Sequence, residues 1–253
     1  MRYLILSDIH GNREALEAVL KDARGAYDCA ISCGDLCDYG PDSDFIIEWS
    51  RNNLAGVIRG NHDRVCSGLD NLEQFSELAQ ASARWTMEHL APRNRNYLRE
   101  LPQGPLLVDG TLVLVHGSPR NEDEYVTNLA EVDEIFAFLS QCGPEGTYPH
   151  FFGHTHAQAL FSRSDGRTRR VSPSLAPTRE VQIQLEPRAA YLINPGSVGQ
   201  PRDGDPRAAY AIFDSATRQV SLRRALYDNL ATEKKIVAVG LPPKLGARLA
   251  LGR

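Results

Sequence analysis

Short apolar runs alternate with helical patterns of apolar residues along the first half of the chain. Strands are predicted at residues 3–6, 27–32 and 57–58. Asn12 provides an N-cap for a helix whose apolar face contains Leu16, Val19 and Leu20. Further helices are predicted around residues 45–49, over residues 72–90 and near residues 95–101. This alternation of strands and helices indicates a largely parallel sheet covered by helices.

The second half of the chain is richer in strand patterns. The turn-prone pair Asp109-Gly110 predicts a hairpin between strands at residues 106–108 and 112–115. After a helix near residues 132–139, strands are predicted at residues 151–152, 159–162, 181–185, 191–193, 209–213 and 220–225. These later strands are expected to form a second, mixed sheet.

The two halves together predict an α/β fold of mixed α+β character. We expect a four-layer αββα sandwich, in which two mixed β-sheets are flanked by helices. The length of 253 residues favours a single domain over residues 1–253. The polar segment 163–179 is expected to be a loop or a lid. Residues 241–253 are expected to be a C-terminal tail that is docked on the surface or frayed.

The composition narrows the class of protein. Hydrophobic residues make up 42% and charged residues 24%, which excludes a disordered chain. No apolar run approaches the ~20 residues of a membrane span, and the first residues are typical of a strand rather than a signal peptide. The net charge of −4 argues against a stable nucleic-acid partner. Five cysteines without a paired framework fit a reducing compartment, so a cytoplasmic location is expected. The oligomeric state stays open.

Polar residues gather directly after five of the predicted strands. The blocks are Asp8-Ile9-His10, Gly34-Asp35, Gly60-Asn61-His62-Asp63, His116-Gly117 and Gly153-His154-Thr155-His156. Loops at the carboxyl ends of strands in an open α/β sheet converge on one crevice. Burying so many polar groups together is costly unless they share a partner, and metal ions would supply one.

Seven of these side chains are candidate metal ligands: Asp8, His10, Asp35, Asn61, His116, His154 and His156. Imidazole and carboxylate donors without a thiolate suit manganese, iron, zinc or nickel. Seven donors exceed the needs of one tetrahedral ion, so we expect two divalent ions with Asp35 as the bridging carboxylate. Two ions ~3.5–4 Å apart would activate a water and clamp both oxygens of an in-line displacement at phosphorus.

Each block alone also has an ordinary structural explanation. Asp8 could cap a helix, Gly34-Asp35 could be a turn, and Asn61 could hold a left-handed bend. His154 and His156 would face opposite ways on a strand, so a shared site requires a loop at that point. The occurrence of all five blocks in one chain favours the metal site.

The ordered blocks resemble the signature of the calcineurin-like metallophosphoesterases, which is Asp-x-His, Gly-Asp, Gly-Asn-His-Asp/Glu, a lone His and Gly-His-x-His. The surrounding sequence is similar to a small bacterial phosphoesterase subgroup over nearly the whole chain. Segments that carry this similarity are Asp38-Tyr39-Gly40-Pro41, His116-Gly117-Ser118-Pro119 and Asn194-Pro195-Gly196-Ser197-Val198-Gly199.

The resemblance implies a role for each matching position. One metal ion would be held by Asp8, His10, Asp35 and His156. The other would be held by Asp35, Asn61, His116 and His154. His62 would face the scissile phosphate and protonate the leaving oxygen, and Asp38 would orient His62.

Two positions depart from the family pattern. Members that dephosphorylate proteins carry Arg where this chain has Tyr39, so a protein phosphatase is disfavoured, and Gln158 replaces a frequent proline. The residues predicted to contact the substrate are Tyr39, Asn194, Ser197 and Arg202. Arg202 and Arg207 could bind a distal phosphate, although the acidic residues beside them favour internal pairing.

The expected activity is hydrolysis of a phosphodiester or a nucleotide-type pyrophosphate linkage in a small substrate. It would proceed by in-line attack of a metal-bridging hydroxide with His62 as general acid. The resemblance implies two divalent ions, with manganese favoured over iron, zinc or nickel, and substrates that include dinucleoside polyphosphates. A phosphomonoesterase of the same mechanism is the alternative, and a non-catalytic scaffold on the same fold is the third hypothesis.

Overall fold

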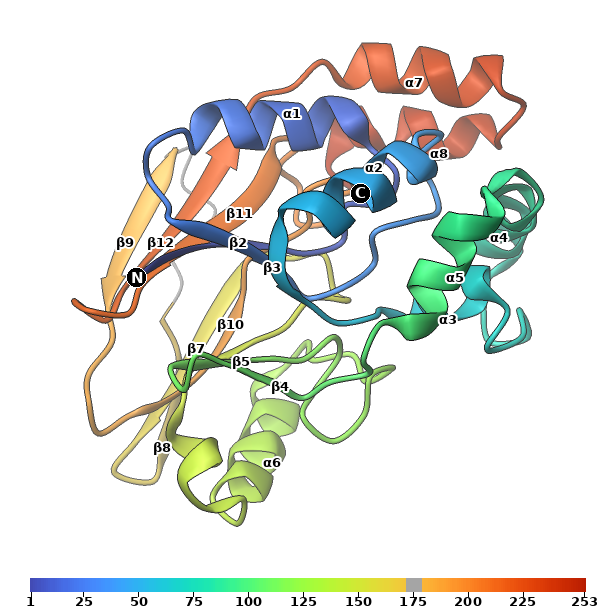
Figure 1. The fold of residues 1–253 in the computed structure, drawn as a ribbon. Coiled ribbons are helices and arrows are strands. Elements are labelled where there is room, and N and C mark those ends of the chain that lie inside the picture. The colour runs from blue at the N-terminus through green and yellow to red at the C-terminus, as the bar shows by residue number, and fades with distance from the viewer. Residues whose placement is uncertain (172–178) are drawn as a thin grey trace.

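Two six-stranded sheets stack against each other, and helices cover their outer sides (Figure 1). The computed structural model describes residues 1–171 and 179–253. The predicted fold class, two mixed sheets flanked by helices, is confirmed.

The first sheet has the strand order β3-β2-β1-β11-β12-β9. Its strands are β1 (Arg2–Leu6), β2 (Cys29–Ser32), β3 (Leu54–Val57), β9 (Glu180–Gln184), β11 (Ala208–Asp214) and β12 (Gln219–Ala225). Strands β1, β2 and β3 are parallel, whereas β11, β12 and β9 continue the sheet in antiparallel pairs. The carboxyl ends of three parallel strands therefore meet at one edge.

The second sheet has the strand order β4-β5-β6-β10-β7-β8. Its strands are β4 (Leu106–Val108), β5 (Leu112–Leu114), β6 (His150–Phe151), β7 (Ala159–Ser164), β8 (Arg167–Arg170) and β10 (Ala190–Asn194). Its central strands β5, β6 and β10 are parallel, and the outer pairs are antiparallel.

The helices form three groups around the sheets (Figure 1). Over the first sheet lie α1 (Arg13–Asp22), α2 (Ser43–Asn53), α7 (Asn229–Ala238) and α8 (Pro243–Ala247). Helices α3 (Asn61–Ser67), α4 (Glu77–His89) and α5 (Pro92–Glu100) cluster at one end. Helix α6 (Leu129–Leu139) lies beside the second sheet, and two short 3-10 helices cover Gly143–Thr147 and Leu249–Leu251.

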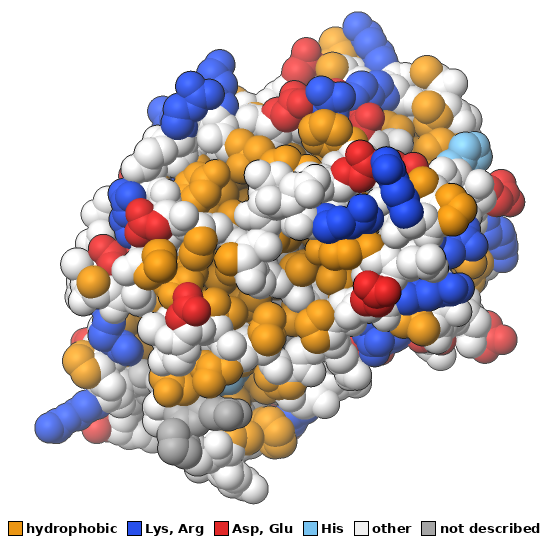
Figure 2. Space-filling view, in the orientation of Figure 1, with side chains coloured by type: hydrophobic (Ala, Val, Ile, Leu, Met, Phe, Trp, Pro, Cys, Tyr) orange, Lys and Arg blue, Asp and Glu red, His pale blue; other side chains and the backbone are white. Residues whose placement is uncertain are grey.

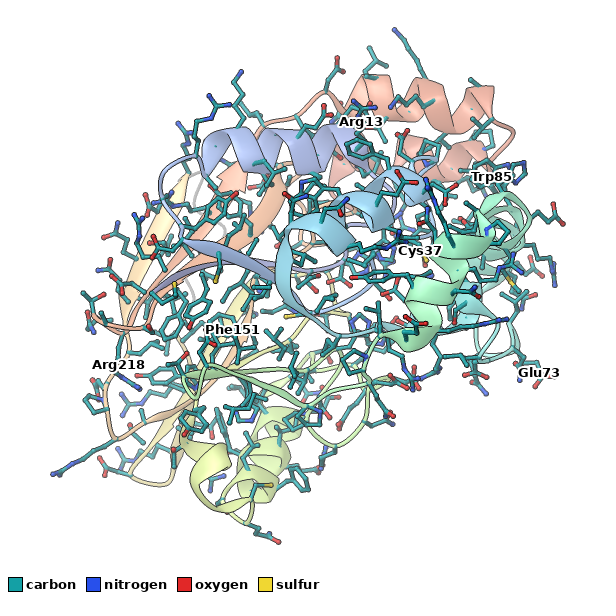
Figure 3. The ribbon with its side chains drawn as sticks, in the orientation of Figure 1. Arg13, Cys37, Glu73, Trp85, Phe151 and Arg218 are labelled. Atoms are coloured by element: carbon teal, nitrogen blue, oxygen red, sulfur yellow. The ribbon has the colours of Figure 1, made fainter. Side chains whose placement is uncertain are left out.

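Strand β1 shows why the sheets are buried on both faces. Its side chains alternate: Leu4 and Leu6 pack against the helices, whereas Tyr3 and Ile5 pack in the layer between the two sheets. Phe151 of the second sheet lies in the same layer and is labelled in Figure 3. Burial on both faces explains the continuous apolar run at the start of the chain.

The surface mixes charges of both signs. On the face drawn in Figure 2, Lys and Arg side chains are interspersed with Asp and Glu. Among the described residues, no helix combines the length and the apolar character that crossing a membrane would require.

Three later strands were assigned to the wrong sheet. Strands β9, β11 and β12 were expected in the second sheet, but they complete the first, where β11 pairs directly with β1. A local pattern of apolar residues predicts that a segment is a strand and does not specify its partner.

The expectation of a loop over residues 163–179 was wrong for its first part. Residues of β7 and β8 pair as an antiparallel hairpin that turns at Asp165 and Gly166, both with positive φ. Residues 172–178 lie outside the described residues, so a lid role for this segment stays a prediction.

The tail at residues 241–253 is docked and not frayed. It contains α8 and the 3-10 helix Leu249–Leu251, and its side chains Leu241, Leu245 and Leu249 are buried.

Helices α3 and α7 were not predicted. The long helix α4 begins later than expected, at Glu77, because the Ser76 hydroxyl caps it by accepting the N–H of Ala79.

We expect Ile5→Ala to lower the free energy of unfolding by about 2–5 kcal/mol, because it opens a cavity between the two sheets. Ile5 is completely buried, whereas Val237 on α7 is 51% exposed. Val237→Ala is therefore the matched control and should change stability by less than about 0.5 kcal/mol. Urea denaturation measures both variants. Equal effects would contradict the assignment of Ile5 to the core.

Candidate metal centre

The seven predicted ligands lie together at the carboxyl ends of five strands from both sheets. Asp8 and His10 follow β1, Asp35 follows β2, Asn61 follows β3, His116 follows β5, and His154 and His156 follow β6. All seven side chains are buried, with exposed fractions of 7% or less. The chain thus brings these polar groups together in one buried pocket, as convergence of strand ends predicts.

The backbone that carries these ligands is in an uncommon conformation. Ten described non-glycine residues have positive φ, and seven of them belong to this region: Asp8, His10, Asp35, Asp38, Tyr39, His154 and His156. Such conformations cost free energy and persist where surrounding structure enforces them, typically at functional sites. His154 and His156 lie on a loop and not on a strand, so their side chains can reach the same pocket.

The ligand atoms form two groups that share one carboxylate. One atom each from Asp8, His10, Asp35 and His156 lie within 4.8 Å of one another, and so do atoms from Asp35, His116 and His154. Asn61 adds an oxygen to the second group, since its Oδ1 is 3.1 Å from His116 Nε2 and 3.1 Å from His154 Nδ1. This partition is the one that the family resemblance implies.

Backbone carbonyls orient the imidazoles for ligation. Nδ1 of His10 lies 3.0 Å from the Cys37 carbonyl oxygen, and Nδ1 of His156 lies 2.7 Å from that of Gln200. When each Nδ1 donates its proton to that carbonyl, the two Nε2 lone pairs face each other at 3.1 Å. Two lone pairs repel at that distance, and a cation between them would remove the repulsion. The donor set therefore fits a metal ion.

Buried polar atoms without hydrogen-bond partners support the same conclusion. Asp35 Oδ2 and His154 Nε2 are buried and have no hydrogen-bond partner among the described residues. Burial, opposed in part by the charge of His116, raises the pKa of Asp8 to about 6. Burial lowers the pKa of His116, but the charge of Asp35 outweighs it and raises that pKa to about 10. The pocket thus requires positive charge beside its carboxylates.

Glycines let the ligand loops approach one another closely. A Cβ on Gly60 would lie 2.0 Å from Asp35 Oδ1, and one on Gly153 would lie 1.9 Å from Ser7 Oγ and 2.7 Å from Asp8 Oδ2. Any side chain at either position would push a candidate ligand out of place. These glycines explain why Gly precedes Asn61 and His154 in the sequence blocks.

His62 forms a buried pair with Asp38 beside the metal ligands. His62 Nδ1 lies 2.6 Å from Asp38 Oδ2, and the other Asp38 oxygen accepts the hydroxyl proton of Ser82 at 2.5 Å. Burial lowers the pKa of His62, but the charges of Asp35 and Asp38 and the hydrogen bond to Asp38 together raise it above its ordinary value. The rings of Tyr39 and Phe75 lie 4.6 and 4.5 Å from the His62 ring.

Tyr39 and Arg202, two of the predicted substrate contacts, border the pocket. The Tyr39 ring is 4.7 Å from the His10 ring, and the guanidinium carbon of Arg202 lies 5.7 Å from the centre of the Tyr39 ring. Arg207, in the same segment, pairs with Asp205, as expected from its acidic neighbours.

Asn194 and Ser197, the other two predicted substrate contacts, are fully buried and hydrogen-bonded to the backbone. The Ser197 hydroxyl donates to the Asp8 carbonyl oxygen at 2.8 Å, and Asn194 Nδ2 donates to the Gly153 carbonyl oxygen at 2.9 Å. Both side chains support loops that carry candidate ligands, and a contact of either one with substrate stays a prediction.

Asp63, which belongs to the third sequence block and was given no role there, positions the loop after β2. Its carboxylate accepts the backbone N–H groups of Leu36, Cys37 and Gly60 at 2.9–3.2 Å. It therefore ties the loop after β2 to the start of α3, which carries Asn61 and His62. Asp63 lies two residues after Asn61, in the first turn of a helix. That position is typical of a carboxylate that caps the helix start, and it could have indicated the role of Asp63.

The remaining histidines and the cysteines lie outside this centre. His89 stacks on Trp85 with ring centroids 4.2 Å apart, and His150 is buried with Nδ1 2.9 Å from the Tyr148 carbonyl oxygen. All five cysteines are free, and Cys33, Cys37 and Cys66 are buried. Cys37, labelled in Figure 3, packs in the core between the first sheet and its helices, which supports a packing role.

The model of the calcineurin-like phosphoesterase superfamily domain matches residues 1–218. The chain belongs to the calcineurin-like phosphoesterase superfamily. Family members are metal-dependent, and the buried Asp and His groups described above are suited to bind metal. The resemblance read from the five blocks is thereby confirmed, while the metal used and the individual ligand roles stay predictions.

Individual proteins are similar to this chain over nearly their whole length. The chain is 32% identical over 256 residues to an uncharacterized protein of Methanocaldococcus jannaschii. The alignment covers 98% of this chain and 97% of that protein. The chain is also similar to a crystal structure of a metallophosphoesterase from Sphaerobacter thermophilus, with 36% identity, a TM-score of 0.84 and coverage of 100% and 99%. A hypothetical protein from Pyrococcus horikoshii shares the fold at 19% identity and a TM-score of 0.75, with coverage of 100% and 98%.

We expect Asp35→Asn to abolish stable binding of both ions, because Asp35 belongs to both ligand groups and an amide carries no charge. Elemental analysis after dialysis against manganese would show two ions in the parent protein and fewer than one in the variant. Glu17→Gln, at a carboxylate 52% exposed on α1, is the control and should keep both ions. One ion retained at full occupancy would contradict the bridging role.

Proposed function

We propose that this protein is a binuclear metal-dependent phosphoesterase that hydrolyses a phosphodiester or a nucleotide-type pyrophosphate linkage. The observation that carries the proposal is the pair of ligand groups sharing Asp35, with the His62–Asp38 pair directly beside them. The family assignment supports hydrolysis of a phosphoester as the general class. A scaffold role is disfavoured, because every candidate ligand and His62 are present.

The chain would hold one ion through Asp8, His10, Asp35 and His156. The other would be held through Asp35, Asn61, His116 and His154. When bound, two divalent ions supply Lewis-acid stabilisation of phosphoryl charge and lower the pKa of a coordinated water. The protein's own part is to hold the ligand atoms in fixed positions and to exclude bulk water from the buried pocket.

His62 is the residue proposed to deliver a proton to the leaving oxygen. Asp38 accepts the Nδ1 proton at 2.6 Å, which fixes the ring and leaves Nε2 for the substrate. The raised pKa of His62 keeps a larger share of the imidazole protonated near neutral pH. A positioned acid of this kind contributes about 10²–10⁴-fold to a rate.

Side-by-side hydrolysis rates test the substrate class. The substrates are bis-nitrophenyl phosphate, nitrophenyl phosphate and a dinucleoside polyphosphate, each with metal-free protein and after reconstitution with manganese, iron, zinc or nickel. We expect metal-dependent turnover, with the diester or the polyphosphate preferred over the monoester. Preference for nitrophenyl phosphate would favour a phosphomonoesterase, and no turnover with any metal would reject the hydrolase.

His62→Ala should slow hydrolysis of a phenyl phosphodiester by about 10²–10⁴-fold and of the matching nitrophenyl diester much less. Nitrophenolate is the better leaving group and needs little protonation, so the two substrates separate acid catalysis from other losses. Metal content should be unchanged. His89→Ala, outside the centre, is the control. An equal loss on both diesters would remove His62 from the acid role.

Asp38→Asn should move the basic limb of the pH–rate profile to lower pH by about 1 unit. Asp38 helps to raise the pKa of His62, so the protonated form persists to higher pH in the parent protein and is lost earlier in the variant. Ser82→Ala removes a hydrogen bond to Asp38 without removing charge, and should shift the limb less. A limb that stays in place would show that His62 does not control it.

A further inference from the structure

Tyr125 places an exposed aromatic ring directly on a candidate metal ligand. The centre of its ring lies 4.0 Å from the centre of the His154 ring, at an interplanar angle of 42°. His154 is only 4% exposed, whereas Tyr125 is 52% exposed. Tyr125 therefore contacts the metal centre and stays open to solvent at its border.

Exposed aromatic residues are rare in this chain. Within residues 1–171 and 179–253, only Tyr125 and Phe138 are exposed among the Phe, Tyr and Trp residues. Phe138 is a residue of α6, whereas Tyr125 contacts a candidate ligand. The Tyr125 hydroxyl forms no hydrogen bond within the part of the chain that the structure describes. Tyr125 thus keeps both its ring and its hydroxyl available beside the centre.

The loop that carries Tyr125 is held in place on both sides of this residue. The N–H groups of Ser118 and Glu124 donate to the carbonyl oxygen of Asn121 at 2.9 and 3.3 Å. The next residue, Val126, is 4% exposed and packs with apolar side chains of α6 and the second sheet. The position of the Tyr125 ring is therefore set by the fold and does not depend on a bound ligand.

The acidic side chains of this loop all have arginine partners. Arg64 of α3 pairs with Glu122 and, at 3.0 Å, with Asp123. Glu124 pairs with Arg120 inside the loop. Within the described ranges, the loop thus has no unpaired carboxylate that would repel an anionic ester. Its arginines are occupied by the same pairs, so the loop offers a ligand the Tyr125 ring rather than a charge.

An open aromatic ring beside a phosphate site suits a nucleobase. Bases stack on aromatic side chains, and the interaction tolerates any base because each has a flat π-face. In a nucleotide ester the base is joined to the phosphate through one sugar. With that phosphate at the candidate ligands, which include His154, the nucleoside would extend to the border where Tyr125 lies.

We propose that Tyr125 is a specificity-determining residue that stacks on the nucleobase of a nucleotide ester whose phosphate lies at the metal centre. This inference rests on the proposed function and narrows its substrate class to phosphate esters that carry a nucleoside. The ring would contact the substrate away from the reacting phosphorus, so it would contribute to binding rather than to the chemical step.

Calorimetric binding of two phosphonates tests the contact without turnover. One is the analogue of AMP in which CH2 replaces the 5′ oxygen, and the other is ethylphosphonate, which lacks the nucleoside. A phosphoesterase cleaves neither P–C bond. Both are titrated into manganese-loaded protein at a fixed excess of free manganese. We expect the parent protein to bind the nucleoside phosphonate more tightly, and Tyr125→Ala to weaken that binding by about 10-fold while ethylphosphonate binding changes less than about two-fold.

Two further variants separate the ring from other effects. Tyr125→Phe keeps the ring and should bind the nucleoside phosphonate within about two-fold of the parent protein. Phe138→Ala, at the other exposed aromatic residue, is the matched control and should leave both affinities unchanged. Elemental analysis should find the same metal content in every variant, because Tyr125 is not a candidate ligand.

Three results would overturn the contact. The first is equal affinity of the parent protein for the two phosphonates, and the second is unchanged affinity in Tyr125→Ala. The third is an equal loss for both ligands in Tyr125→Ala, because the ring would then only support His154.

Hydrolysis of bis-nitrophenyl phosphate by the parent protein distinguishes this inference from the proposed function. If the parent protein hydrolyses it but Tyr125→Ala keeps full affinity for the nucleoside phosphonate, the stacking contact is rejected and the hydrolase stands. If affinity depends on Tyr125 but nothing is hydrolysed with any metal, the nucleoside contact stands and the hydrolase is rejected.

Discussion

The carboxylate of Asp35 is completely buried, and its Oδ2 has no hydrogen-bond partner among the described residues. That oxygen lies 3.5 Å from Nε2 of His10 and 3.4 Å from Nε2 of His116, while Oδ1 accepts the N–H of His62 at 2.9 Å. A buried carboxylate is costly unless positive charge lies beside it, so the pocket depends on positive charge at this point. The rest of the centre is arranged around that requirement. Imidazoles approach from both sheets, and Nδ1 of His10, His116 and His156 each lies within hydrogen-bond distance of a backbone carbonyl oxygen.

Holding these groups in place requires rigid support. Left-handed backbone at Asp8, Asp35 and His154 is unfavourable by itself, and it is stabilised here by hydrogen bonds between loops that lie far apart in the chain. Asp63 joins the loop after β2 to α3, and Ser197 joins the Asp8 loop to the segment after β10. Because the packed sheets anchor the start of each loop and the loops are hydrogen-bonded to one another, movement of one candidate ligand is resisted by its neighbours. A metal site requires ligand atoms that are held in fixed positions by the surrounding residues.

Local patterns in the sequence predicted the strands, the turns and the candidate ligands, but they did not predict how distant strands pair. The strand at residues 106–108 and the hairpin turn at Asp109-Gly110 were predictable, since apolar runs and turn residues act over a few positions. The convergence of the candidate ligands in one place was predictable because five blocks end five strands. The placement of β11 next to β1 was not, since pairing depends on contacts across the whole chain.

The brace that Ser197 provides has a consequence for how the protein is made. The hydroxyl of Ser197 supports the carbonyl of Asp8, a residue 189 positions earlier in the chain, and β11, still later in the chain, is the antiparallel partner of β1. While the chain is leaving the ribosome, its earliest carboxylate and imidazole loops therefore lack their supports until most of translation is complete. Acquisition of a cation would accordingly belong to the finished polypeptide, and which ion is inserted would reflect the metal pool that the released protein meets rather than the one available during its synthesis.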